Sequence, residues 1–127
     1  MITIIDNTLS KEECNELIML YEQNIECCHQ HNGTYPLNIN NARVAFDRIE
    51  SLIDKVLNRV YNINKDVELH WIEIVKWPTG TFQPLHLDTA SDETVFTSIT
   101  YLNDEFDGGG TWFPKYNLLS ISKVESI

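Results

Sequence analysis

The sequence predicts an α+β fold, with helices in the first half of the chain and strands in the second. Two segments of the first half have apolar residues at helical spacing, whereas residues 66–127 are rich in β-branched and aromatic residues. Two amphipathic helices must pack on something apolar, and the β-rich half is the only large candidate. We therefore expect one domain over residues 1–127, with helical support at about 1–65 packed on a sheet from about 66–127.

The first helix is expected to begin at Ser10, after a short β-like run at residues 2–5. Ser10-Lys11-Glu12-Glu13 is a capping box, in which the Ser hydroxyl accepts from the amide three residues on and Glu13 reaches back. Spacings of 3, 4, 7, 11 and 14 residues then define one apolar stripe, made of Cys14, Leu17, Ile18, Tyr21, Ile25 and Cys28. The stripe predicts that Cys14 and Cys28 are core residues.

The end of this helix has two interpretations. The run Cys27-Cys28-His29-Gln30-His31 offers thiolates and imidazoles that bind zinc, but no second pair follows at structural-zinc spacing. The other interpretation is a fraying helix end before Asn32-Gly33, with Gly33 in the left-handed cap position. Residues 32–41 then read as a loop, which either touches a ligand or is a plain linker.

The second helix is expected from about Ala42 to about Tyr61. Its apolar positions again follow helical periodicity, at Ala42, Ala45, Ile49, Leu52, Ile53, Val56, Leu57 and Val60. A strand is expected from Val67 to Trp77, before the turn Pro78-Thr79-Gly80. His70 falls on the face opposite Leu69 and Trp71, so it is either an exposed histidine or a substitute metal ligand.

The chemistry centres on His86-Leu87-Asp88. In an extended chain His86 and Asp88 share a face, while Leu87 is expected to point into apolar packing. An imidazole and a carboxylate are two of the three ligands of the 2-His-1-carboxylate triad that binds Fe(II). A predicted strand, Thr94–Leu102, follows, then an acidic, glycine-rich turn at residues 103–110, and then a strand at residues 111–113.

This order of motifs resembles the prolyl 4-hydroxylase-like branch of the Fe(II)/2-oxoglutarate dioxygenases. The matching elements are His86-x-Asp88, Tyr101-Leu102-Asn103, the acidic turn, Gly108-Gly109-Gly110-Thr111 and Phe113-Pro114. The resemblance covers about 40 residues strongly and the helical part only loosely.

The resemblance implies a double-stranded β-helix, or jelly roll, whose first sheet is buttressed by the two helices. It further implies Fe(II) bound by His86 and Asp88, 2-oxoglutarate as co-substrate, and ascorbate as an accessory reductant. Thr111 would lie beside the distal carboxylate of 2-oxoglutarate, and Tyr101 would offer a second hydroxyl. Trp77 takes a position where the family often has a Tyr that holds 2-oxoglutarate, and it lacks that hydroxyl.

The family pattern continues beyond Phe113-Pro114, with about three strands that carry a second metal-binding His and a basic residue for 2-oxoglutarate. Residues 115–127 contain no His, and Lys115 and Lys123 match no family motif. The resemblance therefore implies a C-terminally truncated, incomplete jelly roll with an exposed sheet edge. Such an edge predicts a homo-oligomer or a second chain that completes the sheet and supplies the missing ligand.

Composition narrows the partners. Nine Lys and Arg against nineteen Asp and Glu give a net charge of -10, which repels nucleic acid and anionic membrane surfaces. The N-terminus lacks a signal-peptide pattern, and no apolar run is long enough to span a membrane. Three cysteines without a C-x-x-C favour a reducing compartment, so we expect a cytoplasmic protein.

Three functional hypotheses follow from different classes. The first is a hydroxylase that acts on a C–H bond of a peptidyl or small-molecule substrate. The second is a degenerate oxygenase, without catalytic activity, that works as a binding or assembly module. The third is a small jelly-roll metal or sugar binder, for which the Tyr-Leu-Asn and Gly-Gly-Gly-Thr elements would be coincidental.

Overall fold

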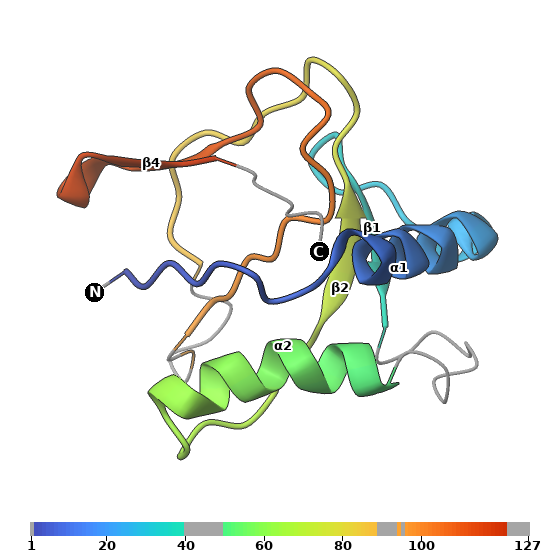
Figure 1. Cartoon of the computed structure of the whole chain (residues 1–127). Coiled ribbons are helices and arrows are strands. Elements are labelled where there is room, and N and C mark those ends of the chain that lie inside the picture. The colour runs from blue at the N-terminus through green and yellow to red at the C-terminus, as the bar shows by residue number, and fades with distance from the viewer. Residues whose placement is uncertain (1, 40–49, 89–93, 95, 122–127) are drawn as a thin grey trace.

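The protein has a mixed α+β architecture with two helices and two small antiparallel sheets (Figure 1). A computed structural model describes residues 2–39, 50–88, 94 and 96–121. Its elements in chain order are α1 (Lys11–Gln23), the 3-10 turn η1 (Ile25–Cys27), β1 (Tyr35–Asn38), α2 (Glu50–Ile63), β2 (Glu73–Lys76), β3 (Thr111–Phe113), the 3-10 turn η3 (Pro114–Tyr116) and β4 (Leu118–Ser120). The predicted fold class is thus confirmed at the level of α+β.

Helix α1 begins where the capping box predicts. The Ser10 hydroxyl accepts from the Glu13 amide at 3.1 Å, and the Glu13 carboxylate accepts from the Ser10 amide at 3.0 Å. The helix ends at Gln23, earlier than the apolar stripe predicts, because the Asn24 side chain donates to the Leu20 carbonyl at 2.8 Å. The chain then forms η1, so Ile25 is exposed and Cys28 only half-buried, and the prediction of Cys28 as a core residue is wrong.

Strand β1 replaces part of the predicted loop at residues 32–41. It pairs antiparallel with β2, with Tyr35 opposite Lys76 and Asn38 opposite Glu73. The turn before it uses positive φ at Asn32 (51°) and Gly33 (81°). Gly33 therefore adopts the predicted left-handed conformation, but in a tight turn between His31 and Thr34 rather than at a helix end.

Helix α2 extends from Glu50 to Ile63, two residues past the predicted end at Tyr61. The predicted start at Ala42 lies outside the described residues. Its apolar face turns inward at Leu52 and Ile53, which are buried, and at Val56 and Leu57, which are partly buried.

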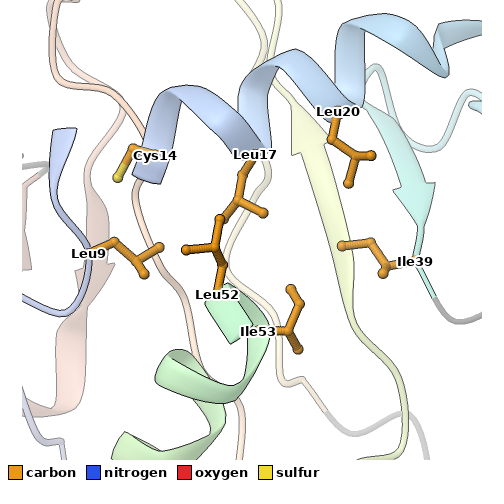
Figure 2. Close-up of a cluster of buried hydrophobic side chains, with 7 residues drawn as sticks. All are labelled: Leu9, Cys14, Leu17, Leu20, Ile39, Leu52 and Ile53. Carbon is orange, nitrogen blue, oxygen red and sulfur yellow. The ribbon is translucent and has the colours of Figure 1, made fainter. Parts of the chain in front are cut away.

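The core lies where the two helices meet the start of the chain and the β1–β2 ribbon. Its buried side chains are drawn in Figure 2 and are Leu9, Cys14, Leu17, Leu20, Ile39, Leu52 and Ile53. In that view Leu52 and Ile53 of α2 extend toward Leu17 of α1, and Leu9 reaches the same cluster from the N-terminal segment. Ile72 and Ile74 of the β2 region pack against it, as does Leu102. The helices therefore bury their apolar faces against each other as well as against strand residues.

Several predicted strands are absent from the described chain. Residues 2–5 and 67–72 are irregular, so the predicted strand from Val67 to Trp77 is correct only for Glu73–Lys76. Thr94 and residues 96–102 are also irregular, although their composition favours a strand. A strand needs a neighbour for its backbone hydrogen bonds, and β propensity does not supply one.

The second sheet pairs β3 with β4, with Thr111 opposite Ser120 and Phe113 opposite Leu118. Strand β3 coincides with the strand predicted at residues 111–113. The turn before it has positive φ at Gly108 (75°) and Gly109 (69°), as its glycines predict. In Figure 1 β4 lies far from α1, on the other side of the molecule.

The described residues form two separate two-stranded sheets and no closed barrel. Each strand has one partner within these ranges, so each keeps a free edge. The jelly roll that the family resemblance implies stays a prediction. No helix in the described part of the chain is long and apolar enough to cross a membrane.

Candidate metal centre

His86 and Asp88 lie side by side, as their spacing predicts. His86 Nε2 is 2.9 Å from Asp88 Oδ1, and both side chains are about half exposed, at 48% and 50%. Two ligand atoms that are each about 2.1 Å from one metal ion and at right angles to each other lie about 3.0 Å apart. The separation of the two atoms therefore suits neighbouring positions around a single ion.

The Pro84 carbonyl oxygen fixes the orientation of the His86 ring. It lies 2.8 Å from His86 Nδ1, and because a carbonyl only accepts hydrogen bonds, Nδ1 carries the proton. Nε2 is then the nitrogen that faces Asp88 with its lone pair, unless a second proton or a metal ion occupies it. Metal-binding histidines are commonly held in this way, with the other ring N–H donated to a backbone carbonyl.

Protonation competes with a metal ion for His86 Nε2. The hydrogen bond to the Pro84 carbonyl raises the pKa of His86 above its ordinary value of 6.5, and the neighbouring Asp88 carboxylate raises it further. In the protonated state the pair is an imidazolium–carboxylate ion pair. Between two negative or partly negative oxygens, the ring needs a positive charge at Nε2, from either a proton or a metal ion.

Leu87 does not pack into a core as the alternation predicts. Its side chain is 83% exposed, and its neighbours Leu85 and Phe82 are 71% and 78% exposed. The segment around the motif is irregular rather than a strand, although the alternation still places His86 and Asp88 on one side. Alternation predicts which side chains share a side of the chain, but not which side is buried.

Tyr101 and Thr111, two of the residues assigned to 2-oxoglutarate, are brought together. The Tyr101 hydroxyl is 2.7 Å from Thr111 Oγ1, and it also lies 3.4 Å from the Ser120 carbonyl, to which it can donate. Both side chains are half-buried at the β3–β4 ribbon. Thr111 is held there by the pairing of β3 with Ser120 in β4. No hydrogen bond or ion pair of the described residues joins these hydroxyls to His86 or Asp88.

Trp77, the third residue assigned to 2-oxoglutarate, directly follows β2 and is 48% exposed. His70, the candidate substitute ligand, is exposed and stacks against Trp71 with ring centroids 4.7 Å apart. The structure thus brings together two pairs of predicted site residues, His86 with Asp88 and Tyr101 with Thr111.

A third protein ligand is not found within the described ranges, where no three His, Cys, Asp or Glu side chains gather as a metal site would require. The same holds for the described tract from Cys27 to His31, which is therefore not a metal site by itself. The sequence did not single out Pro84, whose carbonyl orients the metal-facing ring. Its position two residues before His86 was the available signal, because side chains and carbonyls near a bend are close in space.

Comparisons with known proteins add no relative, because no protein-family model, no curated protein and no solved structure matches the chain. The family resemblance therefore depends on the motifs and on the geometry around them.

Proposed function

We propose that the chain is an Fe(II)- and 2-oxoglutarate-dependent dioxygenase of prolyl 4-hydroxylase type, which hydroxylates a C–H bond of a peptidyl or small-molecule substrate. The observation that carries the proposal is the His86–Asp88 pair, with its 2.9 Å separation and its ring oriented by the Pro84 carbonyl. Fe(II), when bound, supplies the redox chemistry that couples oxidative decarboxylation of 2-oxoglutarate to hydroxylation of the substrate.

In this proposal the chain's own residues bind and orient. His86 presents Nε2 and Asp88 presents Oδ1 to the ion, while Pro84 keeps the proton of His86 on Nδ1. Because both side chains are about half exposed, open positions remain for a co-substrate. Thr111 and Tyr101 offer two hydroxyls that already share a hydrogen bond, so a carboxylate arriving there would accept from hydroxyls held in place.

The assignment of Trp77 to the co-substrate is part of the proposal, as a flat wall rather than a hydrogen-bond donor to the 2-oxoglutarate carboxylates. Its exposed position after β2 leaves the ring accessible. Ascorbate and an incomplete jelly roll belong to the same proposal, since both follow from the family resemblance alone. The cytoplasmic location is likewise proposed, on the cysteine content.

The test is an anaerobic titration of the chain with Fe(II) and 2-oxoglutarate, following the visible iron-to-ketoacid charge-transfer absorbance. We expect a band in the parent protein, loss of the band in His86→Ala and in Asp88→Asn, and an unchanged band in His70→Ala. A band that survives His86→Ala would refute the assignment of the metal ligand. A band lost in His70→Ala would show that His70 is a ligand as well.

A second candidate, a catalytically inactive binding or assembly module, is favoured by two observations. The described residues supply two metal ligands rather than three. Three large apolar side chains near the motif, Phe82, Leu85 and Leu87, are each more than two thirds exposed, which is typical of an interaction surface.

The two candidates differ in turnover and in self-association. The module predicts no succinate from 2-oxoglutarate under aerobic conditions, together with concentration-dependent assembly through the free strand edges. A clean monomer in sedimentation equilibrium at high concentration would count against assembly. Succinate formation that depends on His86 would eliminate the inactive module.

A further inference from the structure

A polar pocket of about 390 Å³ lies between the N-terminal segment and α2, and neither His86 nor Asp88 lines it. From α2 it receives Lys55, Asn58, Arg59 and Asn62, whose spacings of 3, 4 and 7 residues place them on one face of the helix. That face is separate from the apolar one at Leu52 and Ile53. The N-terminal segment covers it, with Asn7 and Glu13 among the residues that line the opposite wall.

Both walls of the pocket are held in place by packing. Leu9 anchors the N-terminal segment in the core, where it is 6% exposed (Figure 2). The capping box fixes Glu13 at the start of α1, and Glu13 forms an ion pair with Lys55 that joins the two walls. The left-handed backbone at Asn7, with φ of 60°, turns the chain just before Leu9. The polar groups are therefore positioned before any ligand arrives.

The charge of the pocket is opposite to that of the chain. Lys55 and Arg59 carry positive charge and Glu13 carries negative charge, so the pocket has a net charge of about +1, whereas the whole chain has -10. Glu13 is already bound to Lys55, and the described residues give Arg59 no ion-pair partner. The guanidinium is therefore left to bind an anion from solution.

We propose that this pocket binds a small polar monocarboxylate. The guanidinium fork of Arg59 matches the two oxygens of a carboxylate. A carboxylate carries a single negative charge, which balances the pocket, whereas a phosphate monoester carries about -1.5 to -2 and would face Glu13 and the acidic chain in excess. Asn58 and Asn62 supply amide donors and acceptors for a hydroxyl or similar group on the ligand.

The size of the pocket limits the ligand further. A volume near 390 Å³ is at the lower end of the range for small-molecule sites, so a compact ligand fits better than a nucleotide or a peptide. The proposal is independent of the proposed metal centre, because its residues come from the N-terminal segment, α1 and α2.

The experiment is a titration of the uniformly 15N-labelled full chain with lactate, and separately with inorganic phosphate, following the side-chain amide signals of Asn58 and Asn62. We expect saturable shifts of both signals with lactate, and weaker binding of phosphate. Arg59→Gln should weaken lactate binding at least about tenfold, as expected for loss of a charge-assisted hydrogen-bonded pair. Lys65→Gln is the matched control, because it removes one positive charge from an exposed residue outside the pocket.

A second variant tests the charge argument and keeps the cap. Glu13→Gln leaves a side chain that can still serve in a capping box, and it raises the pocket charge to about +2. Both ligands should then bind more tightly, with the larger gain for phosphate. The proposal is overturned if lactate gives no saturable shift, if phosphate binds the parent protein more tightly than lactate, or if Arg59→Gln and Lys65→Gln weaken binding equally.

Discussion

Leu17→Ala should remove a large part of the stability of the fold, because Leu17 lies at the centre of the core between α1 and α2. Its side chain is 3% exposed. Truncation to Ala withdraws three carbon groups from the core, at about 0.8 kcal/mol each. The cavity that remains adds a further cost, so we expect a loss of about 3 to 4 kcal/mol. Small domains unfold with about 5 to 15 kcal/mol in total, so the variant should be close to unfolding.

The assay is urea unfolding followed by far-UV circular dichroism, with Met19→Ala as the control. Met19 lies on the same helix and is 57% exposed, so its truncation should change the free energy of unfolding by at most about 0.5 kcal/mol. Leu52→Ala provides a second test, because Leu52 belongs to the same buried cluster. The Leu17 and Leu52 variants should then be non-additive by at least about 0.5 kcal/mol. Equal midpoints for Leu17→Ala and Met19→Ala, or strict additivity with Leu52→Ala, would refute the packing of α1 on α2.

Three further predictions concern ionisable groups. Chiefly the hydrogen bond from Lys55 lowers the pKa of Glu13 below 4.5, so its contribution to stability is present above pH 4.5 and is lost as the pH falls through the lowered value; Glu13→Gln should reduce this acid dependence of the urea midpoint. NMR titration of the metal-free chain should give His86 a pKa above 6.5, and Asp88→Asn should lower it only in part, because the Pro84 carbonyl is the main cause; the pair stabilises the chain below pH 6.5, and that contribution is lost as the pH rises through the raised pKa. Burial raises the pKa of the Cys14 thiol, so iodoacetamide should label exposed Cys27 well before Cys14, and equal rates would contradict the buried position of Cys14.

Features that depend on neighbouring residues in the sequence could be predicted in detail. The start of α1 is an example, because both hydrogen bonds of its capping box join Ser10 to Glu13, three residues away. The left-handed glycines at 33, 108 and 109 are another, because missing Cβ atoms act locally. The proximity of His86 and Asp88 follows from backbone alternation over two residues.

Features that depend on distant partners could not be predicted in this way. Residues 35–38 form β1 because β2 lies beside them, although their Pro and Asn content favours a loop. Residues 96–102 remain irregular despite a strand-like composition. The exposure of Leu87 has the same origin, because burial requires a surface to pack on and the alternation of a strand does not provide one. In the candidate site, the orientation of the His86 ring depends on a backbone carbonyl, which carries no signature in residue type.

All seven side chains of the buried cluster lie between Leu9 and Ile53. During synthesis, these residues leave the ribosome before any residue of β2, β3 or β4, so the apolar nucleus can collapse while the segment with His86 is still being translated. Contacts that are close in the chain form with little loop-closure cost, whereas Ile72, Ile74 and Leu102 can dock only afterwards. The order of translation thus places the helical scaffold first, and the residues proposed to bind metal join a surface that is already assembled.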